Sequence, residues 1–169
     1  MNNVAEVVAA EINESSIHAS LAYLSGTSPA PLEGVEVMIS ERGSEDGRRA
    51  AAQYMEESFE AMDIPARILE FIYGNRRGFN VKVTLQGTGG DKHLWVTAHL
   101  DSVYNAGAND DASGLVSLLL TARALKQLNP QHTVHFVAYD LEKVYEPEQA
   151  SLVGSFLYVG STVGAVRER

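Results

Sequence analysis

Residues 93–139 read HLWVTAHLDSVYNAGANDDASGLVSLLLTARALKQLNPQHTVHFVAY, and the fold class follows from the order of segments within them. A strand is expected over His93–Ala98. A helix is expected over about Gly114–Leu128, capped by Ser113, and its apolar residues on most sides indicate that it packs on a sheet. Thr133–Tyr139 is a nearly continuous apolar run, typical of a buried strand in a mixed or parallel sheet. A strand, a helix and a strand in this order indicate an α/β fold.

The flanking sequence adds a strand hairpin and further helices. Apolar residues recur at helical spacing over Val4–Leu24, whereas Asn80–Gln86 alternates polar and apolar residues, the pattern of a half-exposed strand. The elements expected outside the central stretch are helical turns over Val4–Leu24, a loop after Pro29, a helix from the N-cap Ser44 to Met62, strands over Ile68–Tyr73 and Asn80–Gln86, and a short helix over Ala150–Tyr158. We therefore expect an α/β sandwich with helices on both faces of the sheet and a single domain over residues 1–169.

Composition disfavours several classes of function. The 169 residues include 13 Lys and Arg against 22 Asp and Glu, a formal net charge of −9, so nucleic acid is not an expected partner. No apolar run approaches the roughly 20 residues of a membrane-spanning helix, so no membrane partner is expected. With no cysteine and five histidines, a metal ion would have to be held by histidine and carboxylate side chains. The first residues lack the pattern of a secretory signal, which leaves open a cytoplasmic protein or an exported one whose signal has been removed.

Ionisable residues follow the ends of two expected strands, where open α/β sheets bind their ligands. His99 and Asp101 are two apart on an extended segment, so their side chains point the same way. A carboxylate so placed can hold one imidazole nitrogen and leave the other free for a metal. The pair Asp110-Asp111 precedes the central helix, and Glu142 follows the last strand. Each of these residues has an ordinary structural interpretation by itself, but together they indicate a site.

Two segments in this region are similar to a known family. His99–Ser102 and Gly107–Gly114 resemble the bi-zinc aminopeptidases, the bacterial leucyl-type metallo-aminopeptidases and their relatives. The similarity also covers Tyr73–Val81, the turn Gly87-Thr88-Gly89 and His132–Phe136. The resemblance implies a three-layer α/β/α sandwich around a mixed sheet, of which this chain is a truncated, partial domain. It also implies two zinc ions per site and a peptide substrate that loses its N-terminal residue by hydrolysis.

The resemblance assigns a role to each candidate residue. His99 would be a ligand of one zinc, and Asp110 would be the carboxylate that bridges both zinc ions. Asp101 would orient His99, and Glu142 would be the general base that takes a proton from the zinc-held water. The peptide bond between Asp110 and Asp111 is expected to be cis, as it often is in this family.

The sequence also departs from the family pattern after the last strand. Lys143 stands where the family has a second glutamate, a zinc ligand, and an ammonium group repels a dication. The strand register favours Glu142 as the base, whereas counting back from Gly154 puts Glu148 in that position, and both alternatives stay open. The family takes two further zinc ligands from regions beyond Arg169. We therefore expect at most weak metal binding by this chain alone.

Two alternative functions follow from these departures. The first is a non-catalytic remnant that acts as a binding or oligomerisation module. The second is a glutaminyl cyclase, which uses one zinc on the same fold. The Thr133–Tyr139 strand is expected to leave a bare apolar edge, so the chain dimerises through that edge, covers it with residues 144–166, or behaves poorly in solution.

Overall fold

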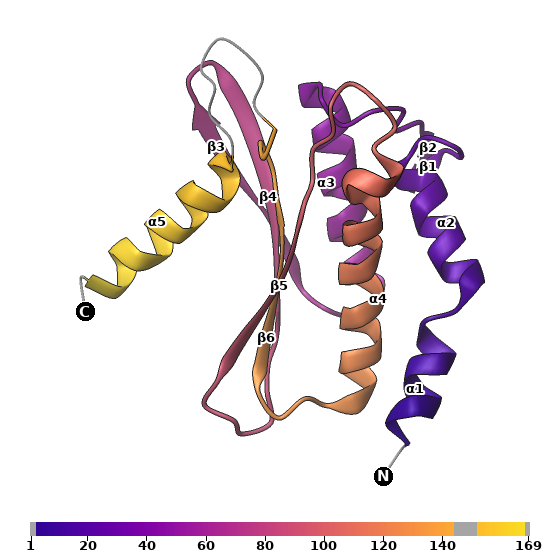
Figure 1. Ribbon diagram of the computed structural model, residues 1–169, viewed down its shortest axis with the longest axis vertical. Helices are drawn as coiled ribbons and strands as arrows, with labels where there is room; N and C mark the ends of the chain where they lie inside the picture. Colours follow the sequence, from indigo (N-terminus) through magenta and orange to yellow (C-terminus); the bar gives the residue numbers. More distant parts are fainter. Residues whose placement is uncertain (1–2, 144–151, 168–169) are drawn as a thin grey trace.

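The centre of the fold is a four-stranded mixed sheet (Figure 1). The computed structural model describes residues 3–143 and 152–167. The strands are β3 (Ala66–Tyr73), β4 (Arg76–Leu85), β5 (His93–His99) and β6 (Thr133–Tyr139), in the spatial order β3-β4-β6-β5. β3 and β4 form an antiparallel hairpin, β6 runs antiparallel to β4, and β5 runs parallel to β6. The expected mixed sheet is therefore confirmed.

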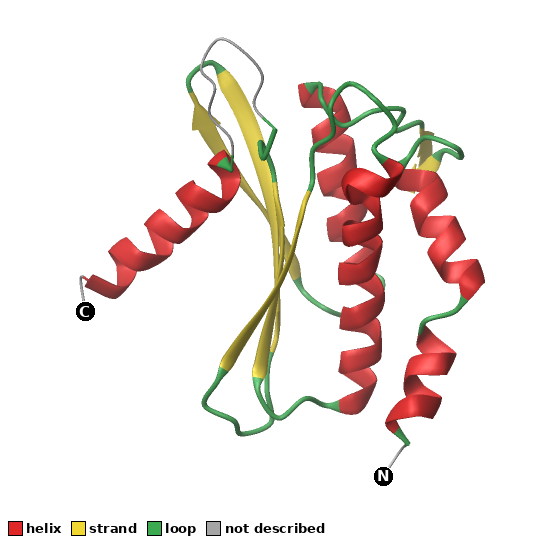
Figure 2. Cartoon of the chain, in the orientation of Figure 1, coloured by secondary structure: helices red, strands yellow, loops and turns green. Residues whose placement is uncertain are grey.

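Helices cover both faces of this sheet (Figure 2). The helices are α1 (Val4–Glu11), α2 (Glu14–Leu24), α3 (Glu45–Glu60), α4 (Ser113–Leu128) and α5 (Val153–Arg167), with a short π-helical segment η1 (Ala108–Ala112) before α4. α3 and α4 pack on one face, α1 and α2 lie outside α4, and α5 lies on the opposite face, where it contacts β4. The arrangement is the expected three-layer α/β/α sandwich.

The main core lies between the sheet and the α3–α4 layer. Met55 and Phe59 of α3 and Phe136 of β6 are buried in this core, and the rings of Phe59 and Phe136 lie 6.3 Å apart. α4 buries residues on several sides, because the sheet covers one side and α1 and α2 cover another. This explains the apolar character of α4 around most of its circumference. Ser44 caps α3 as expected, since its side chain accepts the N–H of Gly47.

Three local predictions need correction. Ser113 is the first residue of α4 and not its cap, because the cap position is Ala112; the Asp111 carboxylate accepts the N–H of Gly114 at 2.9 Å. The segment after Pro29 is not only a loop: β1 (Ala30–Leu32) and β2 (Val35–Val37) form a hairpin, with positive φ angles at the intervening Glu33 and Gly34. The last helix begins at Val153 and extends further than expected, and residues 144–151 lie outside the described part of the chain.

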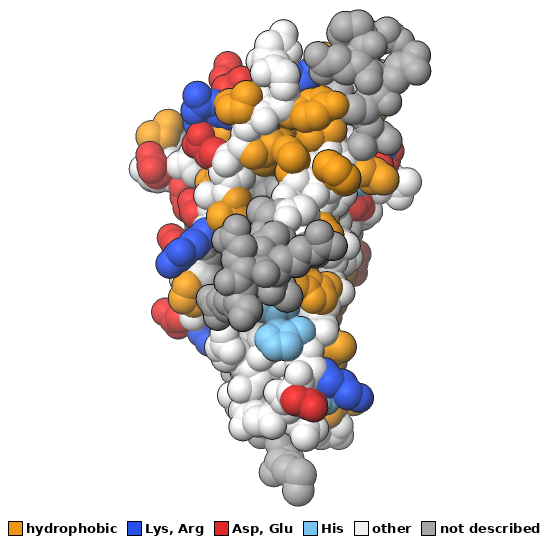
Figure 3. All heavy atoms as spheres, turned by 90° about the vertical axis from the view of Figure 1, so that its left-hand side faces the viewer, with side chains coloured by type: hydrophobic (Ala, Val, Ile, Leu, Met, Phe, Trp, Pro, Cys, Tyr) orange, Lys and Arg blue, Asp and Glu red, His pale blue; other side chains and the backbone are white. Residues whose placement is uncertain are grey.

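The prediction that Thr133–Tyr139 forms a bare edge is wrong. β6 is an interior strand, because β4 pairs with it on one side and β5 on the other. Within the described residues the edge strands of this sheet are β3 and β5, and β5 exposes Leu94 and Trp95 by about half. Hydrophobic side chains also gather on the face that α5 crosses (Figure 3), where Phe156 is 76% exposed.

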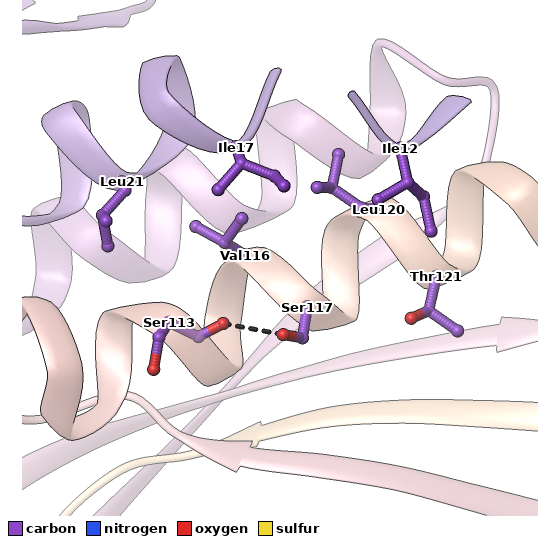
Figure 4. Close-up of a pocket in the computed structure, with 8 residues that line it drawn as sticks. All are labelled: Ile12, Ile17, Leu21, Ser113, Val116, Ser117, Leu120 and Thr121. Carbon is purple, nitrogen blue, oxygen red and sulfur yellow. Dashed lines mark hydrogen bonds between the residues drawn. The ribbon is translucent and has the colours of Figure 1, made fainter. Parts of the chain in front are cut away.

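A hollow of about 280 Å³ lies between the α1–α2 pair and α4 (Figure 4). Aliphatic side chains of Ile12, Ile17 and Leu21 form one wall. The other wall belongs to α4, where Ser117 donates a hydrogen bond to the carbonyl of Ser113. The α1–α2 pair thus packs incompletely on α4. Among the described helices, none has the length and apolar content to cross a membrane.

Candidate metal centre

The candidate site lies at the end of the sheet where β5 and β6 finish and α4 begins (Figure 1). β5 and β6 are parallel neighbours with His99 opposite Tyr139, so the residues after both strands emerge side by side. η1 brings Asp110 to the same end of the sheet. The structure therefore brings together the four residues singled out from the sequence, which are His99, Asp101, Asp110 and Glu142.

His99 is held between two aspartates. Its Nε2 lies 2.8 Å from Asp110 Oδ1, and its Nδ1 lies 2.9 Å from the backbone oxygen of Asp101 and 3.5 Å from Asp101 Oδ1. Burial lowers the pKa of His99, but hydrogen bonds with Asp101 and Asp110 outweigh it and raise this pKa to about 9. The ring thus presents Nε2 to the Asp110 carboxylate, while Asp101 holds the opposite nitrogen.

Asp101 also positions the residues that follow β6. Its buried carboxylate, on a residue only 2% exposed, accepts the backbone N–H of Glu142 at 3.0 Å and that of Lys143 at 2.8 Å. The expected contact with His99 is made chiefly by the Asp101 backbone oxygen, because the carboxylate oxygens point at these two N–H groups. Asp101 therefore connects the end of β5 to the end of β6.

Asp110 and Asp111 have different partners. The peptide bond between them is cis, as expected. Asp111 Oδ2 accepts the His99 N–H at 3.2 Å and its Oδ1 accepts the Gly114 N–H, so this carboxylate joins β5 to the first turn of α4. A Cβ atom at Gly114 would collide with that carboxylate, which explains the glycine. Asp110 keeps its carboxylate at the surface, with the side chain 60% exposed.

Arg42 holds the loop between the end of β5 and η1, and the sequence analysis did not single it out. It is fully buried, and its guanidinium donates to the carbonyl oxygens of Leu100 at 2.8 Å, Ala106 at 2.9 Å and Gly107 at 3.0 Å, and also to that of Leu24. Arginine is rarely buried, so the residue type carried no signal for this position. The guanidinium thus fixes the backbone between the end of β5 and η1.

Glu142 is positioned by the segment that returns to α5. The N–H groups of Leu152, Val153 and Gly154 donate to the carbonyl oxygens of Glu142, Leu141 and Asp140, at 3.0, 3.1 and 3.0 Å. A Cβ atom at Gly154 would collide with Asp140, so only glycine allows this close approach. Glu148, the alternative base, lies outside the described residues.

Comparison with known proteins identifies the family. The family model described as "Peptidase family M28" matches residues 80–165, just over half of the chain. The chain belongs to peptidase family M28. The matched residues include β5, β6, α4 and the four residues singled out from the sequence.

Relatives of this M28 chain include aminopeptidases. Aminopeptidase YwaD from Bacillus subtilis is 39% identical over 67 residues, which are 39% of this chain and 13% of that protein. The solved structure of a zinc aminopeptidase from Bacillus subtilis superposes with a TM-score of 0.70 at 13% identity, over 86% of this chain and 64% of that one. The structure of a glutaminyl cyclase from Macrostomum lignano superposes with a TM-score of 0.69 at 18% identity, over 95% of this chain and 48% of that one. The chain thus spans less than two thirds of each of these proteins, and the structural matches establish the fold alone.

Lys143 places a positive charge beside Asp110. Its ammonium group forms an ion pair with Asp110 Oδ2, on the opposite carboxylate oxygen from His99. Hydrogen bonds from Lys143, and then from His99, hold the pKa of Asp110 below its ordinary value. Both oxygens of the Asp110 carboxylate therefore face a nitrogen group of this chain.

The other histidines lie away from this M28 site. His18 is on α2 beside Glu14, His93 begins β5, His132 precedes β6, and His135 lies within β6. Across residues 3–143 and 152–167, no three His, Asp or Glu side chains are grouped closely enough to hold a metal ion by themselves. The described residues thus offer an incomplete ligand set.

Proposed function

We propose that this M28 chain carries part of the active site of a zinc-dependent aminopeptidase, which hydrolyses the N-terminal residue from peptides. The observation that carries the proposal is the pair His99 Nε2 and Asp110 Oδ1, 2.8 Å apart where β5 ends and α4 begins. The similarity of part of the chain to aminopeptidase YwaD supports the same reaction and the same class of substrate.

The donor groups on this chain fit one zinc ion in part. Imidazole nitrogen and carboxylate oxygen are ordinary zinc ligands, and His99 and Asp110 supply one of each. Glu142 Oε2 is buried and has no hydrogen-bond partner in the described part of the chain. An unpartnered buried oxygen is costly unless a water or ligand satisfies it. A catalytic zinc takes three protein ligands, so the remaining ligand would come from outside the described residues.

Each residue would have a distinct role in hydrolysis. A bound zinc ion supplies Lewis acidity and lowers the pKa of water. His99 offers Nε2 because the Asp101 backbone oxygen holds its Nδ1. Glu142 accepts a proton from the attacking water through its unpartnered Oε2 and returns it to the leaving amino group. Asp101 keeps Glu142 in place by accepting its backbone N–H.

Calorimetric zinc titration of the whole chain tests this proposal. Zinc binding by the wild type should be lost in Asp110→Ala and His99→Ala, and should be unchanged in the control Asp91→Ala, which alters an exposed turn before β5. Glu142→Gln should keep zinc binding and lose hydrolysis of an aminoacyl chromogenic substrate. Equal zinc binding by the wild type and Asp110→Ala, or no zinc binding by the wild type, would refute the assigned site.

A non-catalytic binding or oligomerisation module is the second candidate function. The ion pair between Lys143 and Asp110 favours it, because the ammonium satisfies the carboxylate without a metal ion. This candidate predicts a stably folded chain that binds no zinc and hydrolyses no aminoacyl substrate. The same titration and assay distinguish it from the aminopeptidase.

A further inference from the structure

Histidine and aromatic side chains gather on the α5 face of the sheet, away from the candidate metal centre. The strand register places Thr84 of β4 and Trp95 of β5 on either side of His135 of β6. Alternate residues of a strand share a face, so His93 lies on the same side as Trp95. This side of the molecule is turned to the viewer in Figure 3. The group therefore joins three neighbouring strands under α5.

His93 and His135 form a histidine pair that shares one hydrogen bond. His93 Nδ1 lies 2.8 Å from His135 Nε2, and His135 Nδ1 lies 3.0 Å from the Thr84 hydroxyl. A hydrogen bond between two imidazole nitrogens needs one N–H donor and one bare acceptor. The neutral pair has both, and so does a pair that has taken up one proton. A second proton puts an N–H on both nitrogens, so the hydrogen bond is lost and two cations face each other.

The surroundings of the histidine pair oppose positive charge. His135 is only 9% exposed, and burial, followed by the charges of Lys82 and His93, lowers its pKa. Lys82 faces the pair from β4. The other titratable side chains of the group, Tyr139 of β6 and Tyr158 of α5, are uncharged at acid pH. A doubly protonated pair would therefore stand beside a third cation, the ammonium group of Lys82.

Trp95 and Lys82 connect the histidine pair to α5. The Trp95 indole stacks on His135 with the ring centres 4.3 Å apart, and it meets the Tyr158 ring edge-on at 5.8 Å. The Lys82 ammonium lies 5.6 Å from the centre of the same Tyr158 ring, on which Tyr139 also packs. Tyr158 is buried by these contacts. The groups that face His135 are thus the groups that hold Tyr158.

The amino end of α5 has a separate anchor. The Gly154 N–H donates to the carbonyl of Asp140 at 3.0 Å, and the Gly154 carbonyl accepts the Asn80 side-chain amide at 2.9 Å. Among residues 153–160, whose side chains the structure describes, Tyr158 is the last that is buried, and Phe156 is 76% exposed. Loss of the Tyr158 contacts would therefore leave this part of α5 attached chiefly through its first turn.

We propose that the histidine pair is an acid-sensitive latch for α5, which swings away from the sheet about its Gly154 anchor when the pair takes up a second proton. A charged His135 repels Lys82 from the Tyr158 ring. It also needs water, because a buried charge without a partner is costly, and Trp95 must move to admit that water. Since burial and positive neighbours lower the pKa of His135, the release belongs below the ordinary histidine pKa of about 6.5.

Hydrogen exchange of the whole chain between pH 7 and pH 5 tests the latch. A detached helix of this length is marginal in water. Corrected for the intrinsic effect of pH, protection of the amides of residues 156–159 should fall by about tenfold or more. The emission maximum of Trp95, the only tryptophan, should move to longer wavelength as the indole meets water. Protection at Leu118–Leu120 of α4 should not change, and its loss over the same range would reveal global unfolding and overturn the proposal.

Two variants separate the pair from either histidine alone. Glutamine can still bond to its neighbours but takes up no proton, so neither His93→Gln nor His135→Gln can form two facing cations. Both variants should keep the protection of residues 156–159 constant between pH 7 and pH 5. His18→Gln removes an exposed histidine of α2 and should behave as the wild type.

Each remaining outcome contradicts the latch. A wild type that keeps α5 protected at pH 5 would overturn it, and so would a transition that persists in either His93→Gln or His135→Gln. Circular dichroism at pH 7 verifies that each variant is folded before the comparison.

Discussion

His99 and His135 lie on adjacent strands of one sheet, yet their surroundings shift the imidazole pKa in opposite directions. His99 ends β5 among carboxylates, and hydrogen bonds with Asp101 and Asp110 raise its pKa to about 9 against the effect of burial. His135 lies within β6, and burial, followed by the charges of Lys82 and His93, lowers its pKa. The two rings belong to opposite ends of the same parallel strand pair.

The two histidines have different partners at the two ends of the β5–β6 strand pair. At the amino end, His135 Nε2 lies 2.8 Å from His93 Nδ1, and its Nδ1 lies 3.0 Å from the Thr84 hydroxyl. The indole of Trp95 stacks on the His135 ring at 4.3 Å. This environment favours a neutral ring, whereas that of His99 favours the protonated ring. The neighbouring groups, and not the strand itself, set the direction of each pKa shift.

Arg42→Met should have the largest effect on the free energy of unfolding. It acts at the end of the β5–β6 strand pair where His99 lies among carboxylates. The substitution leaves the carbonyl oxygens of Leu100, Ala106 and Gly107 buried without their donor, so we expect a loss of about 3 kcal/mol in the free energy of unfolding. Urea denaturation measures it. Arg49→Met is the control, because Arg49 is 45% exposed in its ion pair with Glu45 and should cost less than about 1 kcal/mol. Equal losses in both variants would contradict the supporting role of Arg42.

Asp101→Asn should have the next largest effect. The amide nitrogen would face one of the N–H groups of Glu142 and Lys143, so we expect a loss of about 2 kcal/mol in the free energy of unfolding. The amide hydrogens of these two residues should also exchange faster with solvent. Asp91→Asn, in the exposed turn before β5, is the matched control. Unchanged exchange at residues 142 and 143 would show that Asp101 does not hold them.

The lowered pKa of His135 predicts that stability depends on pH through the amino end of the β5–β6 strand pair. The unfolded chain takes up a proton near the ordinary histidine pKa of about 6.5, whereas the lowered pKa keeps His135 neutral in the folded chain. Its contribution to stability is therefore present above about pH 6.5 and is lost as the pH falls towards the folded pKa. His135→Gln should flatten this decline in urea titrations between pH 7 and 5, and the exposed His18→Gln should not. A wild-type slope in His135→Gln would refute this assignment.

The smallest effect on stability is expected at the edge of the sheet. We predict that the chain associates through β5, which exposes Leu94 by 50% and has an unpaired side within the described sheet. Leu94→Lys should lower the mean mass in sedimentation and change the free energy of unfolding by less than about 0.5 kcal/mol. Ile72→Lys, at a 63% exposed position on the other edge strand β3, is the control. A wild-type chain that sediments as a monomer would contradict the prediction of a dimer.

Local patterns in the sequence were sufficient for the helices and most strands. The alternation in Asn80–Gln86 predicted β4, and Ser44 predicted the start of α3, because period and capping are properties of neighbouring residues. The place of β6 inside the sheet could not be read in the same way. Its apolar run marks burial but does not say which strands lie beside it, and the pairing with β4 joins distant parts of the chain.

The candidate site was likewise predictable in part: the residues themselves could be picked out from the sequence, but their partners could not. His99, Asp101, Asp110 and Glu142 stand out because strand ends are where open sheets place their ligands. Their separate partners were not visible in the sequence: Asp101 accepts two backbone N–H groups after β6, and Asp111 accepts the N–H of Gly114 in the first turn of α4. The role of Arg42 depends on carbonyl oxygens more than fifty residues away, as at Leu100, for which residue type offers no signal.

The position of β6 also bears on the order in which the molecule assembles. β4 and β5 precede β6 in the chain, yet both hydrogen-bond to β6. The β3–β4 hairpin can form early during synthesis, but β5 has no strand to join until β6 has been made. Insertion of a late strand between two earlier ones requires long-range pairing, which is slow. The same strand brings Glu142 and Lys143 to His99 and Asp110, so the residues of the candidate site meet only in the step that completes the sheet.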